Sequence, residues 1–258
     1  MKYLWTEWPK LKSKFLSDRT KLLFIDFDGT LVAIADTPDA VKLEPETKKT
    51  LKDLCATPGI RVVIVSGRPM KELSSYLQLK KAVLAANHGL EMKGRGVQLP
   101  PRAKQARRLR HFIGVMAQKF RMAFSCYPGV LVEDKLFTLS VHFRKLPPEQ
   151  LPVFMEFVRF FRQKYHHYPV VWTQGKKVIE IRPSVYWGKA DTVLHVIQKF
   201  PDALPVAIGD DQADEDMFKI VKKYKGVSIR AGFRKASAAD YFLTSPYDVR
   251  VFLKKLCR

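Results

Sequence analysis

The sequence predicts an α/β fold, in which a Rossmann-like core with a parallel sheet is interrupted by an inserted α+β cap domain. Short apolar runs alternate with helical segments from residue 20 onward, which is typical of a parallel sheet with helices on both faces. The alternation stops near residue 90 and returns after residue 185. A chain of 258 residues is long enough for a core plus one insertion. We therefore expect a core of residues 1–90 and 186–258 and a cap of residues 91–185.

Four apolar runs bounded by polar residues are the expected strands of the core. They span residues 22–25, 61–65, 82–86 and 205–209, with expected helices at 46–55, 71–77 and 189–199. Residues 1–20 form a basic amphipathic segment. We expect this segment to pack against the core, with binding to a membrane surface as the alternative.

The expected cap combines amphipathic helices with short alternating strands. One helix is expected over residues 102–120, and a second follows Pro147–Pro148. Strands are expected at 130–135, 136–144, 168–173 and 177–182, with a hairpin turn around Gln174–Gly175. This order predicts an antiparallel sheet beside two helices.

The composition limits the classes of protein that the chain can belong to. The 46 Lys and Arg outnumber the 25 Asp and Glu and give a net charge of +21, and the segment 91–185 holds 18 of these cations against 6 acids. Such a charge suits an anionic substrate or a nucleic acid. Three separated cysteines indicate a reducing compartment. We expect a cytoplasmic monomer. Charged residues interrupt the amino-terminal apolar segment, so no signal peptide is expected, and no apolar run approaches the length of a membrane helix.

Polar side chains gather where the expected parallel strands end, and ligands bind in the crevice beyond that edge of a sheet. These side chains are Asp26 and Asp28, Ser66 and Arg68, Asn87 and His88, and Asp210 and Asp211. Lys189 begins the helix before the last of these strands. Clustered carboxylates repel one another, and a bound Mg²⁺ ion, which prefers oxygen ligands, relieves that repulsion. A lysine beside them provides a positive charge for phosphate oxygens. The pattern predicts a magnesium-dependent site for phosphoryl transfer.

Each residue of this site has an expected task. Asp26 would attack phosphorus and form an aspartyl-phosphate, and Asp28 would serve as general acid and then general base. Ser66 and Lys189 would hold the phosphoryl oxygens. Asp26, Asp28 and Asp210 would bind the metal ion, with Asp211 or Asp214 in support.

These residues also carry a family resemblance. The run Asp26–Thr30 (DFDGT), Ser66, Lys189 and Gly209–Asp211 (GDD) resemble the four motifs of the haloacid dehalogenase-like phosphatases. Further segments resemble the trehalose-6-phosphate phosphatase family, and the resemblance covers residues 21–245. The segments are Ser66–Arg68, Asn87–Gly89, Val132–Lys135, Val141–Arg144, Ile179–Pro183 and Gly209–Phe218. The sequence departs from the family pattern at Ala190 and at Gln212–Ala213.

The resemblance implies hydrolysis of trehalose 6-phosphate, a phosphorylated disaccharide, with Mg²⁺ as cofactor. It also implies that Glu133, Lys135 and Glu180 contact the sugar from the cap. We expect Arg68, Asn87 and His88 to bind the substrate from the core. The strand period places Glu133 and Lys135 on one face, and Glu180 and Arg182 on another.

Simpler interpretations remain for several of these residues. Ser66 as a local cap is the less favoured alternative, whereas a structural hydrogen-bonding role for His88 is weighed equally with substrate contact. Glu215 and Asp216 are expected to form only a solvated acidic helix start. Surface ion pairs are the less favoured alternative for Glu133, Lys135 and Glu180.

Three other functions remain as alternatives. The first is a phosphatase of another sugar or polyol phosphate. The second is a nucleic-acid-binding protein, which the high charge suits but which we do not expect, because no basic patch with interleaved aromatics is present. The third is a structural module without catalysis, which the filled catalytic positions disfavour.

Overall fold

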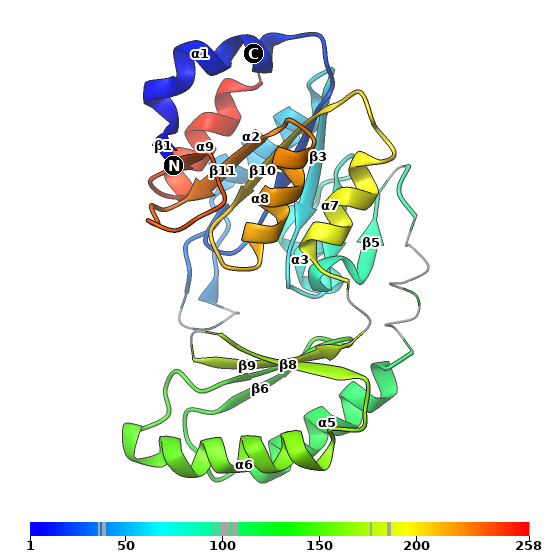
Figure 1. The fold of residues 1–258 in the computed structure, drawn as a ribbon, viewed down its shortest axis with the longest axis vertical. Coiled ribbons are helices and arrows are strands. Elements are labelled where there is room, and N and C mark those ends of the chain that lie inside the picture. Colours follow the sequence, from blue (N-terminus) through cyan, green and yellow to red (C-terminus); the bar gives the residue numbers. More distant parts are fainter. Residues whose placement is uncertain are drawn as a thin grey trace. The chain divides into compact units, whose positions relative to one another are not determined.

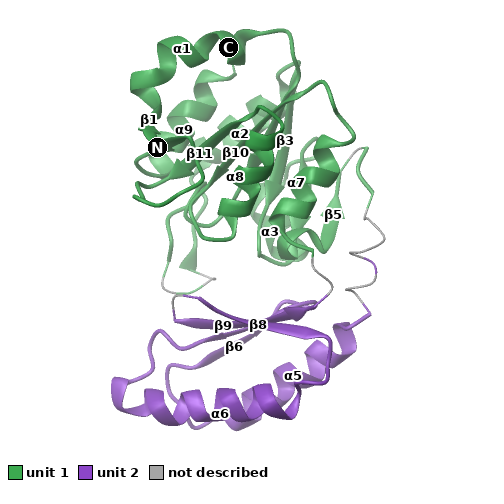
Figure 2. Cartoon of the chain, in the orientation of Figure 1, with its two compact units in different colours: residues 1–99, 187–258 green, residues 100–186 purple. Residues whose placement is uncertain are grey.

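The protein is described by a computed structural model, which describes residues 1–35, 37, 40–94, 96–98, 104, 108–175, 177–184 and 187–257. The chain forms two compact units (Figure 2). The core unit comprises Met1–Leu99 and Trp187–Arg258, and the inserted unit comprises Pro100–Tyr186. We expected the first boundary at residue 90, but the core unit continues to Leu99, because the segment Glu91–Lys93 is a strand of the core sheet.

The core unit is built on a mixed sheet in which only one pair of strands is antiparallel. Its strands, in spatial order, are β1 (Lys2–Tyr3), β12 (Tyr241–Leu243), β11 (Val227–Ala231), β10 (Leu204–Gly209), β2 (Lys21–Ile25), β3 (Ile60–Val65), β4 (Val83–Ala86) and β5 (Glu91–Lys93). All neighbours are parallel except β4 and β5. The α/β class and the parallel core sheet are therefore confirmed.

Helices cover both faces of this sheet (Figure 1). One face packs against α1 (Leu4–Leu16), α2 (Pro45–Ala56), α3 (Met70–Leu77) and α9 (Pro246–Lys255). The other face packs against α7 (Lys189–Ile197) and α8 (Asp214–Lys223). Because both faces are covered, every residue of β2 is buried, and Leu23 and Leu22 point to opposite sides. This burial explains the continuous apolar run in the sequence.

The amino-terminal segment is a part of the core. Strand β1 pairs in parallel with β12, and the indole Nε1 of Trp5 donates a hydrogen bond of 2.6 Å to Asp248 Oδ1 in α9. The rings of Trp8 and Phe15 pack on Phe252 of the same helix. The expected packing of residues 1–20 against the core is found for α1.

The inserted unit has an antiparallel sheet beside two helices. The strands lie in the order β6 (Leu131–Asp134), β7 (Leu139–His142), β9 (Val178–Pro183) and β8 (Val170–Gly175). Helices α5 (Arg110–Ala123) and α6 (Leu151–Lys164) bury their apolar sides against one face of this sheet. Part of the helix expected over 102–120 lies outside the described residues. The expected hairpin of β8 and β9 is confirmed, but Gln174 and Gly175 belong to β8 and not to the turn, since Gly175 pairs with Val178.

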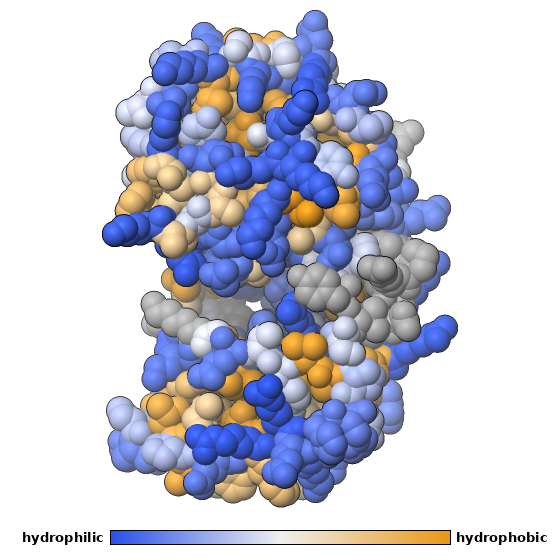
Figure 3. All heavy atoms as spheres, viewed as in Figure 1, coloured by the Kyte–Doolittle hydropathy of each residue, from blue (hydrophilic) through white to orange (hydrophobic). Residues whose placement is uncertain are grey.

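Hydrophilic side chains cover much of the face shown in Figure 3, and apolar side chains occur there in separate groups. Among the described residues, no helix is both long and apolar enough to span a membrane.

Candidate active site

Two neighbouring strands bring two aspartates together at the carboxyl edge of the core sheet. Strand β2 pairs with β10 so that Ile25 lies opposite Ile208, and the next residues of the two segments lead to Asp26 and Asp210. The chain then turns sharply at Gly29, which has a φ of +81°. A Cβ atom there would lie 2.2 Å from Asp210 Oδ2, so only glycine permits this close approach.

Lys189 contacts acidic residues from two separate segments, Asp26 after β2 and Asp214 at the start of α8. Its Nζ donates to Asp26 Oδ1 at 2.7 Å and to Asp214 Oδ1 at 2.8 Å, and it lies 4.0 Å from Asp211 Oδ1. Burial acts to lower the pKa of this amine, but Asp214 and Asp26 outweigh burial and raise its pKa well above the ordinary value. Lys189 is therefore a fixed positive charge in direct contact with Asp26.

One lysine does not neutralise the whole cluster. Burial raises the pKa of Asp26 to about 8, and the charges of Asp211 and Asp210 add to this effect against the opposing charge of Lys189. Burial, with the charges of Asp214 and Asp211, raises the pKa of Asp210 to about 7. Carboxylate oxygens of Asp26, Asp210 and Asp214 all lie within 4.8 Å of one another. This oxygen-only set fits a hard divalent cation, whose charge would favour the ionised carboxylates.

Asp214 and Asp211 have different surroundings, although the sequence left open which of them supports the metal site. Asp214 is fully buried, and its Oδ2 accepts hydrogen bonds from the backbone N–H groups of Asp210 and Asp211 at 2.9 and 3.1 Å. Asp211 has a side chain that is 55% exposed, and its Oδ1 accepts from the backbone N–H of Asp214. Gly209 is required beside them, because a Cβ there would lie 2.3 Å from Asp214 Cγ. Asp214 therefore shapes the loop that carries Asp210.

The side chain of Asp28 lies against Arg68. Its oxygens accept hydrogen bonds of 2.8 Å from Arg68 Nε and Nη2, and the guanidinium also donates to Glu72. Arg68 lies over the rings of Phe27 and Tyr76. Burial opposes the charge of Arg68, but the hydrogen bonds and charge of Asp28 outweigh it and raise the pKa of the guanidinium.

Ser66, Asn87 and His88 form the adjoining turns at the ends of β3 and β4. Ser66 is buried and its Oγ accepts from the backbone N–H of Arg68 at 3.1 Å, while its carbonyl accepts from His88 N–H. Asn87 is also buried, and its Nδ2 donates to Glu91 Oε1 at 2.6 Å. Asn87 and His88 both have positive φ, at 49° and 57°. The structure thus places Ser66 beside Arg68 and turns the Asn87 amide toward β5.

An ion pair that the sequence pattern does not predict supports the acidic loop. Arg230 of β11 donates to the backbone carbonyls of Asp210 and Asp211, and its Nη1 donates to Glu215 Oε1 at 2.9 Å. Both side chains are under a tenth exposed. The prediction that Glu215 is only a solvated residue is therefore wrong, because Glu215 also accepts from Ser237 and from the N–H of Ala238. Asp216, in contrast, is exposed and pairs with Lys219.

The three residues expected to hold a sugar all lie in the inserted unit. Glu133 lies opposite Ser140 in the sheet, and Ser140 lies opposite Glu180, so the two glutamates share the face away from α5 and α6. Glu133 Oε2 contacts His142 Nε2 at 2.8 Å and Lys135 Nζ at 3.5 Å. Ser140 Oγ donates to Glu180 Oε1 at 3.5 Å. The register thus joins the two pairs into one polar face, which the strand period alone did not reveal.

Residues 24–247 match the family model described as trehalose-phosphatase. The chain belongs to the trehalose-phosphatase family. It is 29% identical to trehalose-phosphate phosphatase B of Arabidopsis thaliana and 32% identical to the probable trehalose-phosphate phosphatase E of that plant. Each alignment covers 91% of the chain, which spans 66% and 69% of the length of these relatives.

A solved member of this family has the same fold. The C-terminal domain of the C. albicans trehalose-6-phosphate phosphatase superposes with a TM-score of 0.79 at 24% identity, covering 96% of each chain. The family resemblance seen in the sequence is confirmed. Of its departures, Ala190 lies half-buried in the first turn of α7, where it leaves the contacts of Lys189 intact. Gln212 accepts a hydrogen bond from exposed Arg234.

Proposed function

We propose that the protein hydrolyses trehalose 6-phosphate to trehalose and inorganic phosphate through an aspartyl-phosphate on Asp26. The observation that supports this most is the contact of Lys189 with Asp26, beside Asp210 and the loop shaped by Asp214. A buried nucleophilic carboxylate needs a neighbouring cation to remain ionised, and a phosphoryl group needs a cation to hold its oxygens. Lys189 can serve both needs.

The two half-reactions use two carboxylates. An oxygen of Asp26 attacks phosphorus, and the bond between phosphorus and the sugar oxygen breaks while that oxygen takes a proton from Asp28. A water molecule then attacks phosphorus after giving its proton to Asp28, and the bond to Asp26 breaks to release phosphate. Arg68 holds the carboxyl group of Asp28 beyond the end of β2 through two hydrogen bonds, which supports the role of Arg68 in positioning the general acid. The Ser66 hydroxyl and Lys189 would hold the phosphoryl oxygens.

The carboxylates of Asp26 and Asp210 would hold Mg²⁺ together with the backbone carbonyl of Asp28, and Asp214 would support them. When bound, the ion supplies positive charge that stabilises the transferring phosphoryl group. The raised pKa values of Asp26 and Asp210 support this assignment, because burial and the neighbouring carboxylates oppose their ionisation and a bound cation would favour it.

The inserted unit would act as the cap that selects the sugar, and the core unit as the catalytic domain. Glu133 and Glu180 would accept hydrogen bonds from sugar hydroxyls, and Lys135 would donate to them. Their common face in the sheet supports this role. Arg68 and His88 would contribute substrate contacts from the core side.

The three free cysteines also fit a cytoplasmic protein. We propose that the protein is a monomer, which light scattering can test.

The direct test measures phosphate release from trehalose 6-phosphate with Mg²⁺. The Asp26→Asn variant should lose turnover by about 10³-fold or more, since it lacks the nucleophile. The Asp216→Asn variant is the matched control, because Asp216 is an exposed carboxylate that pairs only with Lys219 in the described structure. Equal turnover by Asp26→Asn and wild type would exclude Asp26 as nucleophile.

The alternative, a phosphatase of another sugar or polyol phosphate, requires a second measurement. Glu133→Ala and Glu180→Ala should reduce kcat/KM for trehalose 6-phosphate by about tenfold each, and leave a small generic phosphate ester nearly unchanged. A wild-type enzyme that hydrolyses other sugar phosphates but not trehalose 6-phosphate would favour the alternative.

A further inference from the structure

A large hollow lies at the amino edge of the core sheet, opposite the edge that carries Asp26. Its volume is about 990 Å³. It is lined by residues at the beginning of β2 and β3, including Thr20 and Gly59, and by residues of the loop before β4 and the end of α7. Thr20 and Asp26 flank the two ends of β2, so the hollow and the carboxylates are about 20 Å apart along that strand. The hollow is therefore separate from the proposed catalytic site.

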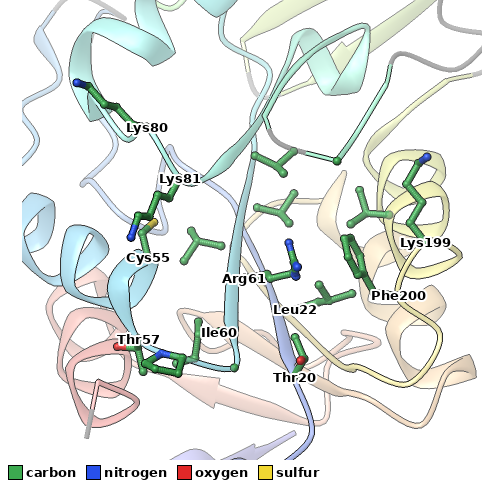
Figure 4. A pocket seen from close by; sticks show the side chains of 17 residues that line it. Thr20, Leu22, Cys55, Thr57, Ile60, Arg61, Lys80, Lys81, Lys199 and Phe200 are labelled. Atoms are coloured by element: carbon green, nitrogen blue, oxygen red, sulfur yellow. The ribbon is translucent and has the colours of Figure 1, made fainter.

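The hollow forms because β3 begins before its neighbour does. Strand β2 pairs with β3 from Ile60 onward, but β4 pairs with β3 only from Val63 onward. Within the described residues, the backbone of residues 60–62 thus has a strand neighbour on one side only. Figure 4 shows labelled side chains on both sides of this strand, with Lys80 and Lys81 on one side and Phe200 on the other. The hollow surrounds a free strand edge.

The described residues of the lining include four cations and no acid. The cations are Arg61, Lys80, Lys81 and Lys199, and none forms an ion pair with another described residue within 4.0 Å. A smaller hollow beside it is lined by Lys52 as well as Lys80 and Lys81. Concave surfaces lined by charges of one sign focus their electrostatic field and raise the local concentration of oppositely charged ligands.

The rest of the lining suits an organic body attached to the anion. The Arg61 guanidinium lies 4.4 Å from the centre of the Phe200 ring, which orients the cation toward the hollow (Figure 4). The half-buried side chains of Ile60 and Phe200 and exposed Pro58 give the lining accessible apolar surface. Ligand sites of this volume combine such apolar surface with a few polar anchors.

We propose that this hollow is a second ligand site, which binds a small molecule carrying a polyphosphate group. The phosphoryl oxygens lie among Arg61, Lys80, Lys81 and Lys199, and several phosphates are needed to reach cations on both sides of β3. The site belongs to the core unit alone and does not depend on the proposed reaction. Binding at this site does not require Mg²⁺. Without Mg²⁺, the acidic cluster around Asp26 repels anions, so binding under these conditions distinguishes the second site from the proposed catalytic site.

The test is calorimetric titration with inorganic tripolyphosphate in a buffer that contains EDTA. Wild type should show saturable one-site binding, and Arg61→Gln with Lys81→Gln should weaken it by about tenfold or more, since charge-assisted hydrogen bonds are lost. The matched control, Lys12→Gln with Lys14→Gln, removes the same charge from exposed positions of α1. The control should bind within about twofold of wild type. All four side chains are exposed, so both variants should unfold at the wild-type temperature.

Two further titrations identify the site and the source of the phosphates. The Asp26→Asn variant should bind tripolyphosphate as wild type does, which separates this site from the catalytic one. Tighter binding of ADP than of pyrophosphate would assign an organic polyphosphate, and equal binding an inorganic one. The proposal would be overturned if tripolyphosphate binding to wild type did not saturate, or if the control variant weakened binding as much as the Arg61→Gln and Lys81→Gln variant does. In either case the positive charge would act only as a diffuse surface field.

Discussion

Arg68 and Asp28 form a two-pronged ion pair in which a buried cation fixes the direction of an exposed carboxylate. The Arg68 side chain is 8% exposed and that of Asp28 is 40% exposed. Both hydrogen bonds measure 2.8 Å, and the stacking of Arg68 near Phe27 and Tyr76 limits its freedom. The side chain of Asp28 therefore has a defined position, which Arg68 sets.

Replacing Arg68 tests that arrangement. Arg68→Gln should lower kcat for trehalose 6-phosphate by about 10²-fold, because a poorly positioned general acid loses most of its effect. Arg68→Lys should fall between this variant and wild type, since an ammonium group keeps the charge but cannot make the paired contact. Steady-state kinetics and melting temperatures of both variants separate positioning from unfolding. Equal kcat in all three proteins would contradict the assigned role.

Metal removal should destabilise the core unit. At a Mg²⁺ concentration 100 times the dissociation constant, binding stabilises the folded state by about 2.7 kcal/mol, or about 5–10 °C in melting temperature. Asp210→Asn should abolish this rise and should melt at a higher temperature than wild type in EDTA, because it relieves repulsion with Asp214 and Asp211. Calorimetric unfolding with and without Mg²⁺ measures both effects. Asp216→Asn should behave as wild type, and a preserved Mg²⁺ response in Asp210→Asn would refute the assigned ligand.

The buried pair of Arg230 and Glu215 should matter for stability and for metal affinity. Arg230→Gln leaves Glu215 without its cation and the carbonyls of Asp210 and Asp211 without a donor, at a cost of about 3 kcal/mol. The melting temperature should fall by about 6–12 °C, and calorimetry should show weaker Mg²⁺ binding. Arg234→Gln provides the control, since Arg234 is exposed and contacts Gln212. Arg230 is assigned the role of holding the loop that carries Asp210 and Asp211. This role would be contradicted if Arg234→Gln weakened Mg²⁺ binding and Arg230→Gln did not.

Glu133 should make the stability of the inserted unit dependent on pH. Burial opposes its ionisation, but the hydrogen bond from His142 and the charge of Lys135 outweigh burial and lower the pKa of Glu133 below its ordinary value of 4.5. A lowered folded-state pKa stabilises the fold above the unfolded pKa, and this contribution is lost as pH falls through the folded value. Glu133→Gln should therefore cost about 1–2 kcal/mol at pH 7 and flatten the decline below pH 4.5.

Thermal unfolding between pH 3 and pH 7 checks this expectation. Glu149→Gln, which changes an exposed glutamate of the same unit, should retain the wild-type profile. Identical pH profiles for Glu133→Gln and wild type would rule out the contribution.

Buried strands with a continuous apolar run could be predicted from the sequence, but short edge strands and the buried strand β11, whose run contains Ser228 and Arg230, could not. The run in β2 is apolar throughout because helices cover both faces, and that pattern is visible in the sequence. Strands β1 and β5 have two and three residues, too few to show a period, and their pairing with β12 and β4 decides their conformation. Tertiary context therefore determined these elements.

The polar partners were also beyond local patterns. Asp26 and Asp210 could be placed together because parallel strands end at one edge. The burial of Glu215 depends on Arg230, which lies in another strand, and an acidic run at a helix start gives no sign of such a partner. The same holds for the register that places Glu133 and Glu180 on one face, since strand pairing is not encoded in the period of either strand.

The packing of the amino-terminal elements β1 and α1 with the carboxyl-terminal helix α9 has a practical consequence for the expression of fragments. A fragment cut at the limits of the family match, residues 24 and 247, would begin inside β2 and stop two residues into α9. It would lack the ring cluster of Trp8, Phe15 and Phe252 and would leave the face of the sheet beneath them open to water. We expect such a fragment to form inclusion bodies, and we expect expression of the folded core unit to need both terminal segments.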